Sequence, residues 1–375
     1  VAPAAPVARA AAAAAAAAVD DVEVLKGPSV VDSKHVRVFH PGMGMAEIQR
    51  RIDEVAPRFL GPAAHFTDER LALLFLPGAY DGLRIPVGYY VQVAGLGAAP
   101  EDVVFRHSSP NTRDDSLTNV YCQAADPDGA GSLDTFWRSA ENFAVDGDLL
   151  WAVSQAAPLR NVRVGRSLVL HDDGRFASGG FAAGVAVGGE TDLGSQQQWA
   201  FRNSAFSSPP KDGAWSIVYA GCEGALGSDG DATYEPDPAA GKPLRSVAPE
   251  TPVVAEKPFL RVRGPGAPAE LLVPPVVRNS IGPNTGADAA PSYRVERPRL
   301  VSLDPDARAL GMHPPSELPA LVKAGESVVL MPGVYELDET LEMATDGQVL
   351  LGLGLATLKA PGAAPCVRVA AGAAD

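Results

Sequence analysis

The stretch LALLFLPGAYDGLRIPVGYYVQVAGLGAAPEDVVF (residues 71–105) has a close counterpart in SVVLMPGVYELDETLEMATDGQVLLGLGLATLK (residues 327–359). In both, an apolar strand runs into Pro-Gly-x-Tyr, an alternating strand follows, and a third strand closes on Gly-Leu-Gly. Proline cannot donate to a β-ladder and ends the first strand, and the glycine beside it permits a sharp corner. This repeat predicts a solenoid of stacked strands. Two unrelated hairpins in a β-sandwich are the alternative.

Apolar residues at helical spacing precede each copy of the repeat. Such a helix covers the core that the first coil of a solenoid would otherwise expose. The residues are Met45, Ile48, Ile52, Val55 and Phe59 in the first copy, and Leu318, Leu321 and Val322, stopped by Gly325, in the second. The fold class predicted is therefore all-β, with two tandem right-handed parallel β-helices.

Composition excludes several classes of function. The chain of 375 residues has room for about two domains, and its 38 Gly and 34 Pro indicate many turns. A net charge of −14 argues against nucleic acid and anionic membranes as partners. Three cysteines give no disulfide framework, and the six scattered histidines show no metal-ligand spacing. No metal and no cofactor is expected, and the oligomeric state stays open.

Changes in composition divide the chain into four parts. Residues 1–21 form an alanine-rich, low-complexity segment, either a linker or the remnant of an export signal. Residues 22–225 form the first β-helix domain, and residues 226–300 an irregular connection with a few strands. Residues 301–375 begin a second β-helix that we expect to be incomplete, so that the chain is a fragment of a longer protein or needs a partner.

A second, weaker repeat runs through the first domain. Asn142, Asn161 and Asn203 each precede or begin an apolar alternation, and they are 19 residues (142 to 161) and then 42 residues (161 to 203) apart. This spacing corresponds to one coil and then two. It predicts asparagines that stack at one corner and hydrogen-bond to one another.

The segment from residue 150 to residue 224 is rich in tryptophan and glutamine. Trp151, Trp199 and Trp215 could stack on sugar rings, whose hydroxyls amide groups bind, or they could fill the solenoid core. Gln196, Gln197 and Gln198 are consecutive, so strand alternation turns at least one amide inward or onto a binding face. A neutral polysaccharide or oligosaccharide is the ligand class that these residues favour.

Three motifs in this segment resemble glycoside hydrolase family 55, the exo-β-1,3-glucanases built from two tandem right-handed β-helices. QAAPLRNV (155–162) resembles its Gln-Ala-x-x-Leu-x-Asn segment, and ASGGF (177–181) its Gly-Ser-Gly-Gly-Phe segment. GSQQQWAFRNSAF (194–206) resembles its Gly-Asn-Gln-Gln-Phe stretch with the Arg-Asn that follows. The sequence departs from this pattern at Ala177, where the family has glycine, and it lacks the Trp-rich segment that follows in the glucanases.

The resemblance implies a secreted, inverting hydrolase that removes glucose from the non-reducing end of β-1,3-glucan. A Gln and a Ser of the first helix, which map onto Gln155 and Ser178, would hold the attacking water. Gln196 and Gln197 would lie near the sugar, and Arg202 is a further candidate contact. The general acid would come from a glutamate of the second helix that we expect this chain to lack.

Carboxylates within the chain are the other candidates for acid chemistry. Glu223 lies among small residues directly after a strand, and Glu141 and Asp173 are weaker candidates. For each of the three, an ordinary solvated surface carboxylate is the favoured interpretation. Besides the hydrolase, two further functions fit the scaffold. One is a non-catalytic glycan-binding or adhesive β-helix, and the other, ranked last, is a polysaccharide lyase.

Overall fold

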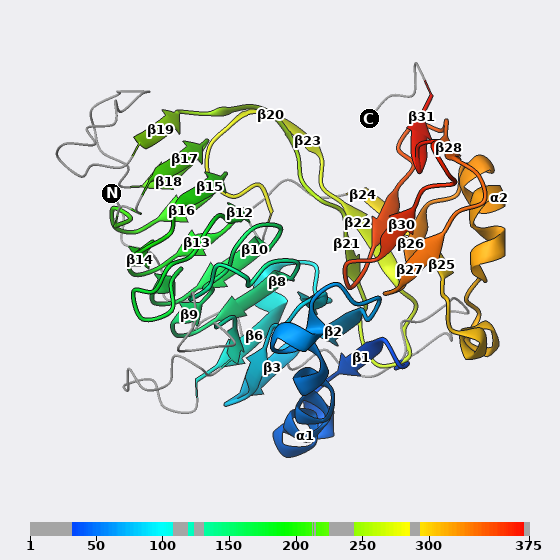
Figure 1. Ribbon diagram of the computed structural model, residues 1–375, viewed down its shortest axis with the longest axis horizontal. Coiled ribbons are helices and arrows are strands. Elements are labelled where there is room, and N and C mark those ends of the chain that lie inside the picture. The colour runs from blue at the N-terminus through cyan, green and yellow to red at the C-terminus, as the bar shows by residue number, and fades with distance from the viewer. Residues whose placement is uncertain are drawn as a thin grey trace, which may run out of the picture.

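The computed structural model describes residues 32–107, 119–123, 131–211, 213, 215–224, 244–285 and 293–370. The alanine-rich segment at residues 1–21 lies outside these residues. The described chain is all-β and mostly parallel, with two short α-helices. Its strands form two stacks that lie side by side and are joined by antiparallel strands (Figure 1).

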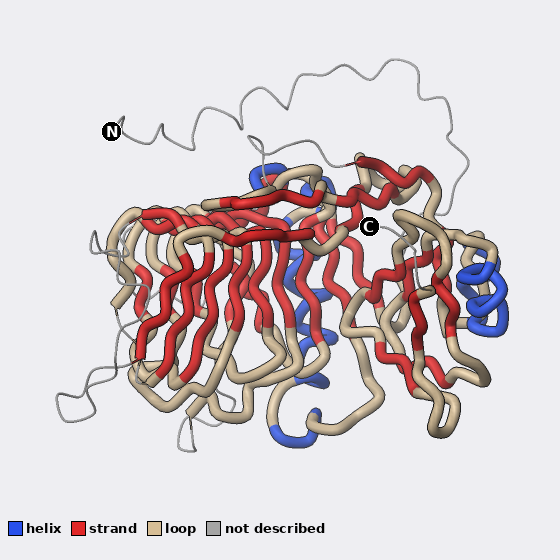
Figure 2. The backbone as a smooth tube through the Cα atoms, turned by 90° about the horizontal axis from the view of Figure 1, so that it is seen from above, coloured by secondary structure: helices blue, strands red, loops and turns tan. Residues whose placement is uncertain are grey.

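The first stack is built on one long parallel ladder. Each strand pairs with the next coil of the chain, which is the geometry that the repeated strand-and-corner pattern predicts. Figure 2 shows these strands lying side by side, with loops at both ends. In order they are β1 (Val36–Phe39), β2 (Leu71–Phe75), β5 (Val91–Gly95), β8 (Ser139–Val145), β10 (Pro158–Val164), β12 (Phe181–Ala183), β15 (Gln198–Arg202), β17 (Ser216–Ala220) and β19 (Leu244–Ala248).

Shorter parallel ladders form the other sides of each coil. Their inward side chains join those of the long ladder in one core of buried apolar residues, including Phe75, Phe105 and Phe143. The strands are β3 (Gly78–Asp81) with β6 (Val103–Arg106), β4 (Arg84–Pro86) with β7 (Asn119–Tyr121), β9 (Leu149–Leu150) with β11 (Leu168–Val169) and β14 (Thr191–Asp192), and β13 (Ala186–Val187) with β16 (Ala205–Phe206) and β18 (Glu223–Gly224).

The predicted asparagine corner is present. Asn142, Asn161 and Asn203 are buried and have φ values of 59°, 52° and 46°, a left-handed conformation that asparagine tolerates better than most residues. The side chain of Asn161 donates to Oδ1 of Asn142 at 2.8 Å. Gly184 occupies the corner between Asn161 and Asn203, which explains the doubled spacing. The ladder is thus confirmed for the first pair and interrupted by glycine before Asn203.

The segment expected to be irregular contains more structure than its Gly and Pro content indicates. β19 adds a parallel strand to the first stack after residue 225. β20 (Thr251–Ala255) then pairs antiparallel with β23 (Val276–Ser280). β21 (Phe259–Arg261), β22 (Glu270–Val273) and β24 (Tyr293–Glu296) form an antiparallel sheet. These strands carry the chain from the first stack to the second.

The second stack repeats the beginning of the first. β25 (Arg299–Val301), β26 (Val328–Leu330) and β29 (Leu350–Gly352) correspond to β1, β2 and β5, and each ladder is parallel. β27 (Val334–Glu336) pairs with β30 (Thr357–Lys359), and β28 (Leu341–Met343) with β31 (Val367–Val369). The lead-in helices are α1 (Met45–Val55) and α2 (Leu318–Lys323), whose buried faces join the cores of their stacks. Both predicted helices are confirmed.

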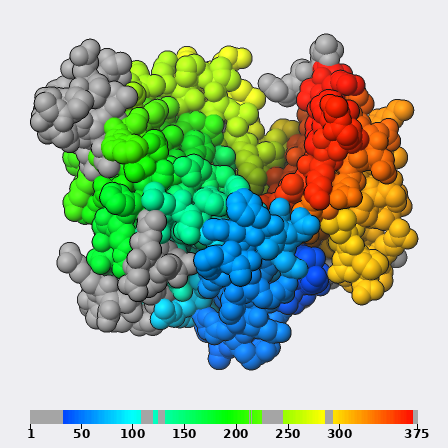
Figure 3. All heavy atoms as spheres, viewed as in Figure 1, coloured from blue at the N-terminus to red at the C-terminus, as the bar shows by residue number. Residues whose placement is uncertain are grey.

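The two stacks meet through outward apolar residues of β2 and β5. Gln92 of β5 accepts a hydrogen bond from the backbone N–H of Gly354, at 2.6 Å, and Arg70 donates to the carbonyl of Leu355 at 3.2 Å. Beyond this contact the two stacks diverge, and the surface is hollowed between them (Figure 3). The apolar residues at the interface include Ala72, Leu74, Leu76, Ala94 and Leu96 from the first stack and Val329, Met331, Leu351 and Leu353 from the second.

Candidate functional site

Three polar side chains form a hydrogen-bonded row where successive strands of the first stack begin. Nε2 of Gln155 donates to Oγ of Ser178 at 3.2 Å, and that hydroxyl donates to Oε1 of Gln198, the first residue of β15, at 3.4 Å. Gln155 and Gln198 are exposed and Ser178 is half-buried. The sequence prediction paired Gln155 with Ser178, and the structure brings them together; it adds Gln198 to the same row.

Left-handed corners hold this row in place. Ala156 has a φ of 56° and Gly179 a φ of 87°, so the chain turns sharply beside both polar side chains. Gly180 faces the ring of Trp199 so closely that a Cβ at this position would lie 2.0 Å from its Cζ3 atom. The Ser-Gly-Gly-Phe segment therefore contains glycine at 179 for its backbone conformation and at 180 for close packing.

The row can bind and orient a water molecule or a sugar hydroxyl. An amide offers both donors and an acceptor, and a hydroxyl offers one donor and two lone pairs. Neither group is a general base at neutral pH. In the described part of the chain, no carboxylate forms a hydrogen bond to any of the three side chains. The row can therefore position a bound water or hydroxyl, but its groups cannot themselves act as the acid or base of a proton transfer.

Three of the predicted substrate contacts lie in the core. Trp151 is fully buried and its indole N–H donates to the carbonyl of Ala157 at 3.1 Å. Trp199 is 2% exposed. Gln196 is fully buried, and its amide donates to the carbonyls of Val153 and Leu170 at 2.9 and 2.8 Å. The core interpretation, which the sequence left open, applies to these residues. Alternation along β15 turns Trp199 inward, and Trp151 and Gln196 are buried at single bridged positions between coils.

Two other predicted contacts remain at the surface near the row. Trp215 is 58% exposed. Gln197 is half-buried, and its carbonyl accepts from the N–H of Ser216 at 2.7 Å, so the two residues occupy adjacent coils. Trp215 and Gln197 are therefore open to a ligand that extends past Gln198.

Glu223 lies away from the row. It belongs to β18, which follows the corner at Gly221. Gln155 and Ser178 lie before the long-ladder strands β10 and β12, at the opposite end of that ladder from the corner. The strand from Ser216 to Ala220 alone separates the two positions by about 13 Å at 3.3 Å per residue. The structure thus does not bring Glu223 together with Gln155 and Ser178. Asp173 is exposed in a turn with a φ of 50°.

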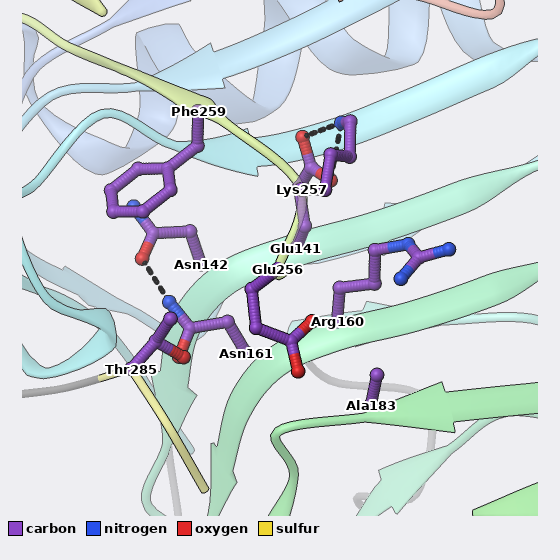
Figure 4. Close-up of a pocket in the computed structure, with 9 residues that line it drawn as sticks. All are labelled: Glu141, Asn142, Arg160, Asn161, Ala183, Glu256, Lys257, Phe259 and Thr285. Atoms are coloured by element: carbon purple, nitrogen blue, oxygen red, sulfur yellow. Dashed lines mark hydrogen bonds and ion pairs between the residues drawn. The ribbon is translucent and has the colours of Figure 1, made fainter. Parts of the chain in front are cut away.

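Glu141 lies on the outward face of the long ladder, where Lys257 (Figure 4) and Gln92 hold its carboxylate. Nζ of Lys257 lies 2.7 Å from both carboxylate oxygens, and Nε2 of Gln92 donates to Oε1 at 2.6 Å. Gln92 is the residue that also contacts Gly354 of the second stack. The carboxylate therefore connects the first stack to the linker and to the second stack.

Arg202, the remaining predicted contact, is engaged in the neighbouring ion pair. Its Nη2 lies 2.5 Å from Oε2 of Glu256, which is 8% exposed. In the ladder, Arg160 lies between Glu141 of one neighbouring coil and Arg202 two coils further on. Its guanidinium lies 4.9 Å from the ring centroid of Phe181, and burial lowers its pKa. The cavity among these residues measures about 20 Å³, which is enough for one water molecule and too small for a sugar ring. This charged cluster fixes the linker and does not form a glycan pocket.

An aromatic group beside the row was not predicted from the sequence. The ring of Phe66, which is 79% exposed, lies 5.2 Å from that of Trp137. The backbone N–H of Trp137 donates to the backbone carbonyl of Gln155 at 3.3 Å. Nothing in the sequence around Phe66 distinguishes it from a core phenylalanine. Its exposure depends on a loop whose course only the tertiary structure defines.

Two further observations concern metals and membranes. Among the residues that the structure describes, no group of three His, Cys, Asp or Glu side chains is arranged to hold a metal ion. No helix within the described ranges is long and apolar enough to span a bilayer.

Comparisons with known proteins agree on one family. The LAM55 pectate lyase-like domain matches residues 316–374. An exo-beta-1,3-glucanase of Streptomyces sp. (strain SirexAA-E / ActE) is 34% identical over 328 residues, which is 86% of this chain and 48% of that protein. The structure of sacteLam55A from Streptomyces sp. SirexAA-E superimposes with a TM-score of 0.74 at 30% identity, over 92% of this chain and 57% of that one.

A second solved structure, a Glu-to-Ala variant of sacteLam55A in complex with glucose, gives a TM-score of 0.71 at 29% identity. The chain spans about half the length of the relatives that it matches. Family model, sequence identity and common fold together confirm the resemblance of this chain to glycoside hydrolase family 55.

Proposed function

We propose that this chain provides the water-binding side of a glycoside hydrolase that acts on β-1,3-glucan. The observation that carries the proposal is the exposed row of Gln155, Ser178 and Gln198 in a chain related to an exo-beta-1,3-glucanase. The structural relative with glucose bound supports a neutral sugar as the ligand class. A net charge of −14 also suits a neutral polysaccharide better than an acidic one.

The reaction proposed is hydrolysis with inversion. Gln155 and Ser178 hold a water molecule, which attacks the anomeric carbon while the bond to the leaving oxygen breaks on the opposite face of the sugar. A carboxylic acid, which we expect the second β-helix of the full enzyme to supply, donates its proton to that oxygen, and the attacking water loses a proton to solvent or to a neighbouring group. Inverting enzymes that use two carboxyl groups keep them about 6.5–9.5 Å apart to leave room for the water.

The proposed architecture places the substrate between two tandem right-handed β-helices. The first comprises residues 22–225 in the sequence-based division, the connection residues 226–300, and the second begins at residue 301. The hollow between the two stacks supports this placement (Figure 3). We also propose that the protein is secreted, because the substrate proposed for it is an extracellular polymer.

Product analysis tests the proposal. The intact protein, as its organism makes it, is incubated with laminarihexaose, and the anomer first released is identified by NMR. We expect α-glucose from the β-linked substrate. Gln155→Ala and Ser178→Ala should each lower kcat by about 100-fold or more, and Glu223→Gln should leave it unchanged.

Three other results would contradict the proposal. β-Glucose as the first product would exclude inversion. Binding of glucan without any product would indicate a non-catalytic glycan-binding protein, and an unsaturated sugar would indicate a lyase.

A further inference from the structure

Phe66 presents an aromatic ring to solvent at the edge of the first stack. At 79% exposure it is the most exposed of the large apolar side chains in the described ranges. Its ring lies 5.2 Å from that of Trp137, at an interplanar angle of 74°. The two rings form an open aromatic corner, and contiguous exposed apolar surface of this kind is typical of ligand-binding sites.

The backbone of Phe66 is strained in order to hold this position. Its φ is 51°, in the left-handed region that a bulky side chain rarely adopts. Burial does not compensate for that conformation, because most of the ring is in contact with water. A residue that is both strained and exposed is characteristic of a binding site.

Rigid neighbours support the pair from beneath. The ring of Trp137 stacks on that of Tyr90, with centroids 5.5 Å apart and planes at 13°. The guanidinium of Arg70 lies 3.8 Å from the centroid of the Tyr90 ring, and Arg70 also donates to the carbonyl of Leu355 in the second stack. The aromatic surface is therefore preorganised, and it lies beside the junction of the two stacks.

The aromatic corner lies one coil away from the polar row. The backbone N–H of Trp137 donates to the backbone carbonyl of Gln155, as between neighbouring strands of the ladder. Trp137 is therefore one coil away from Gln155 and two coils from Ser178. Coils of a parallel ladder are about 4.8 Å apart, which is close to the length of one sugar ring. A chain of linked sugars that reaches the row can therefore cover the aromatic corner as well.

We propose, resting on the function above, that Phe66 and Trp137 form a sugar-stacking subsite for a further glucosyl residue of β-1,3-glucan. The apolar face of the sugar ring packs on the exposed ring of Phe66, and Trp137 sets the orientation of that ring. The subsite binds substrate and takes no part in bond breaking. Its contribution consequently depends on the length of the glucan.

Binding of laminarihexaose and laminaribiose by calorimetry tests the subsite. All proteins carry Ser178→Ala, so that hydrolysis does not consume the ligand. Phe66→Leu keeps apolar bulk without an aromatic face and should weaken hexaose binding about tenfold while leaving biose binding unchanged. Phe66→Tyr keeps the face and should bind hexaose normally. Ile281→Ala, which removes another solvent-facing apolar side chain elsewhere (58% exposed), should have no effect.

Phe66→Gly separates a binding role from a structural one. Glycine relieves the left-handed strain, so the melting temperature should rise or stay level while hexaose binding falls as in Phe66→Leu. A lower melting temperature with unchanged binding would show that Phe66 serves packing and would overturn the subsite.

The outcomes separate the two proposals. Normal hexaose binding by Phe66→Leu overturns the subsite and leaves the hydrolase standing. Phe66-dependent binding without hydrolysis by the protein with Ser178 intact overturns the hydrolase and leaves the subsite. Failure to bind either oligosaccharide overturns both.

Discussion

Tyr80 and Tyr335 occupy equivalent positions in the two stacks and make equivalent hydrogen bonds. The hydroxyl of Tyr80 lies 2.7 Å from the carbonyl of Leu76 and 3.1 Å from that of Phe39. The hydroxyl of Tyr335 lies 2.8 Å from the carbonyl of Met331 and 3.0 Å from that of Val301. In each stack the tyrosine of Pro-Gly-x-Tyr thus ties the corner to the preceding coil.

Removal of either hydroxyl should destabilise the protein. Tyr80→Phe and Tyr335→Phe leave buried carbonyls without this donor, and each should lower the free energy of unfolding by about 1–2 kcal/mol. Urea unfolding followed by circular dichroism measures the change. Tyr293→Phe is the control, because Tyr293 is 49% exposed and its hydroxyl can bond water instead. Equal effects at all three positions would contradict the structural role of the repeat.

Alkaline pH should destabilise the fold. Burial raises the pKa of Tyr80 and of Tyr335 well above the usual range and raises the pKa of Cys222 to about 11. These groups hold their protons more tightly when folded, so their contribution is fully present below the unfolded-state pKa and is lost as pH rises toward the folded-state value. The loss should begin near pH 9 for the thiol and near pH 10 for the tyrosines. Melting temperatures at pH 8, 9.5 and 10.5 test this, and a curve that is flat over this range would refute it.

The Lys257–Glu141 pair should matter more than an exposed ion pair. Lys257→Ala leaves the carboxylate of Glu141, whose side chain is 9% exposed, without its main counter-charge. We expect a loss of about 1–3 kcal/mol, below the value for fully buried pairs because the side chain of Lys257 is 30% exposed. Chemical denaturation measures it. Lys359→Ala, which breaks the exposed pair with Glu336, should cost less than about 0.5 kcal/mol.

Gly180 should tolerate no side chain. In Gly180→Ala the new Cβ would lie 2.0 Å from Cζ3 of Trp199, so the ring or the corner beside Ser178 has to move. We expect a destabilisation of about 1–3 kcal/mol, the usual range for overpacking, together with a change in tryptophan fluorescence. Gly264→Ala is the matched control, since no atom lies within 4 Å of the position that its new methyl group would take and its φ is not left-handed. A stable Gly180→Ala protein with wild-type fluorescence would disprove the close packing.

The fold and its repeat could be predicted from the sequence because both depend on local patterns. Proline, glycine and strand alternation define corners and strands within a few residues, and the asparagine spacing identifies individual coils. The pairing of Gln155 with Ser178 came from the resemblance to a family, since two residues in successive coils share no local signal. Strand alternation alone does not show whether Trp151 and Trp199 face the core or the solvent. The sequence does not place the neighbouring corners to the exact residue, and an error of one residue reverses the inward face.

The coiling of the chain into stacked parallel strands, with two helices as lead-ins and corners at Asn142 and Asn161, follows from the amino-acid sequence alone. The burial of Gln196, the distance of Glu223 from the polar row and the position of Phe66 beside Trp137 became apparent from the three-dimensional arrangement of the coils. Corners and strands follow from the conformational preferences of neighbouring residues. The site, by contrast, depends on contacts between residues that are distant in sequence, and such contacts exist only after the coils have stacked and the two stacks have packed together.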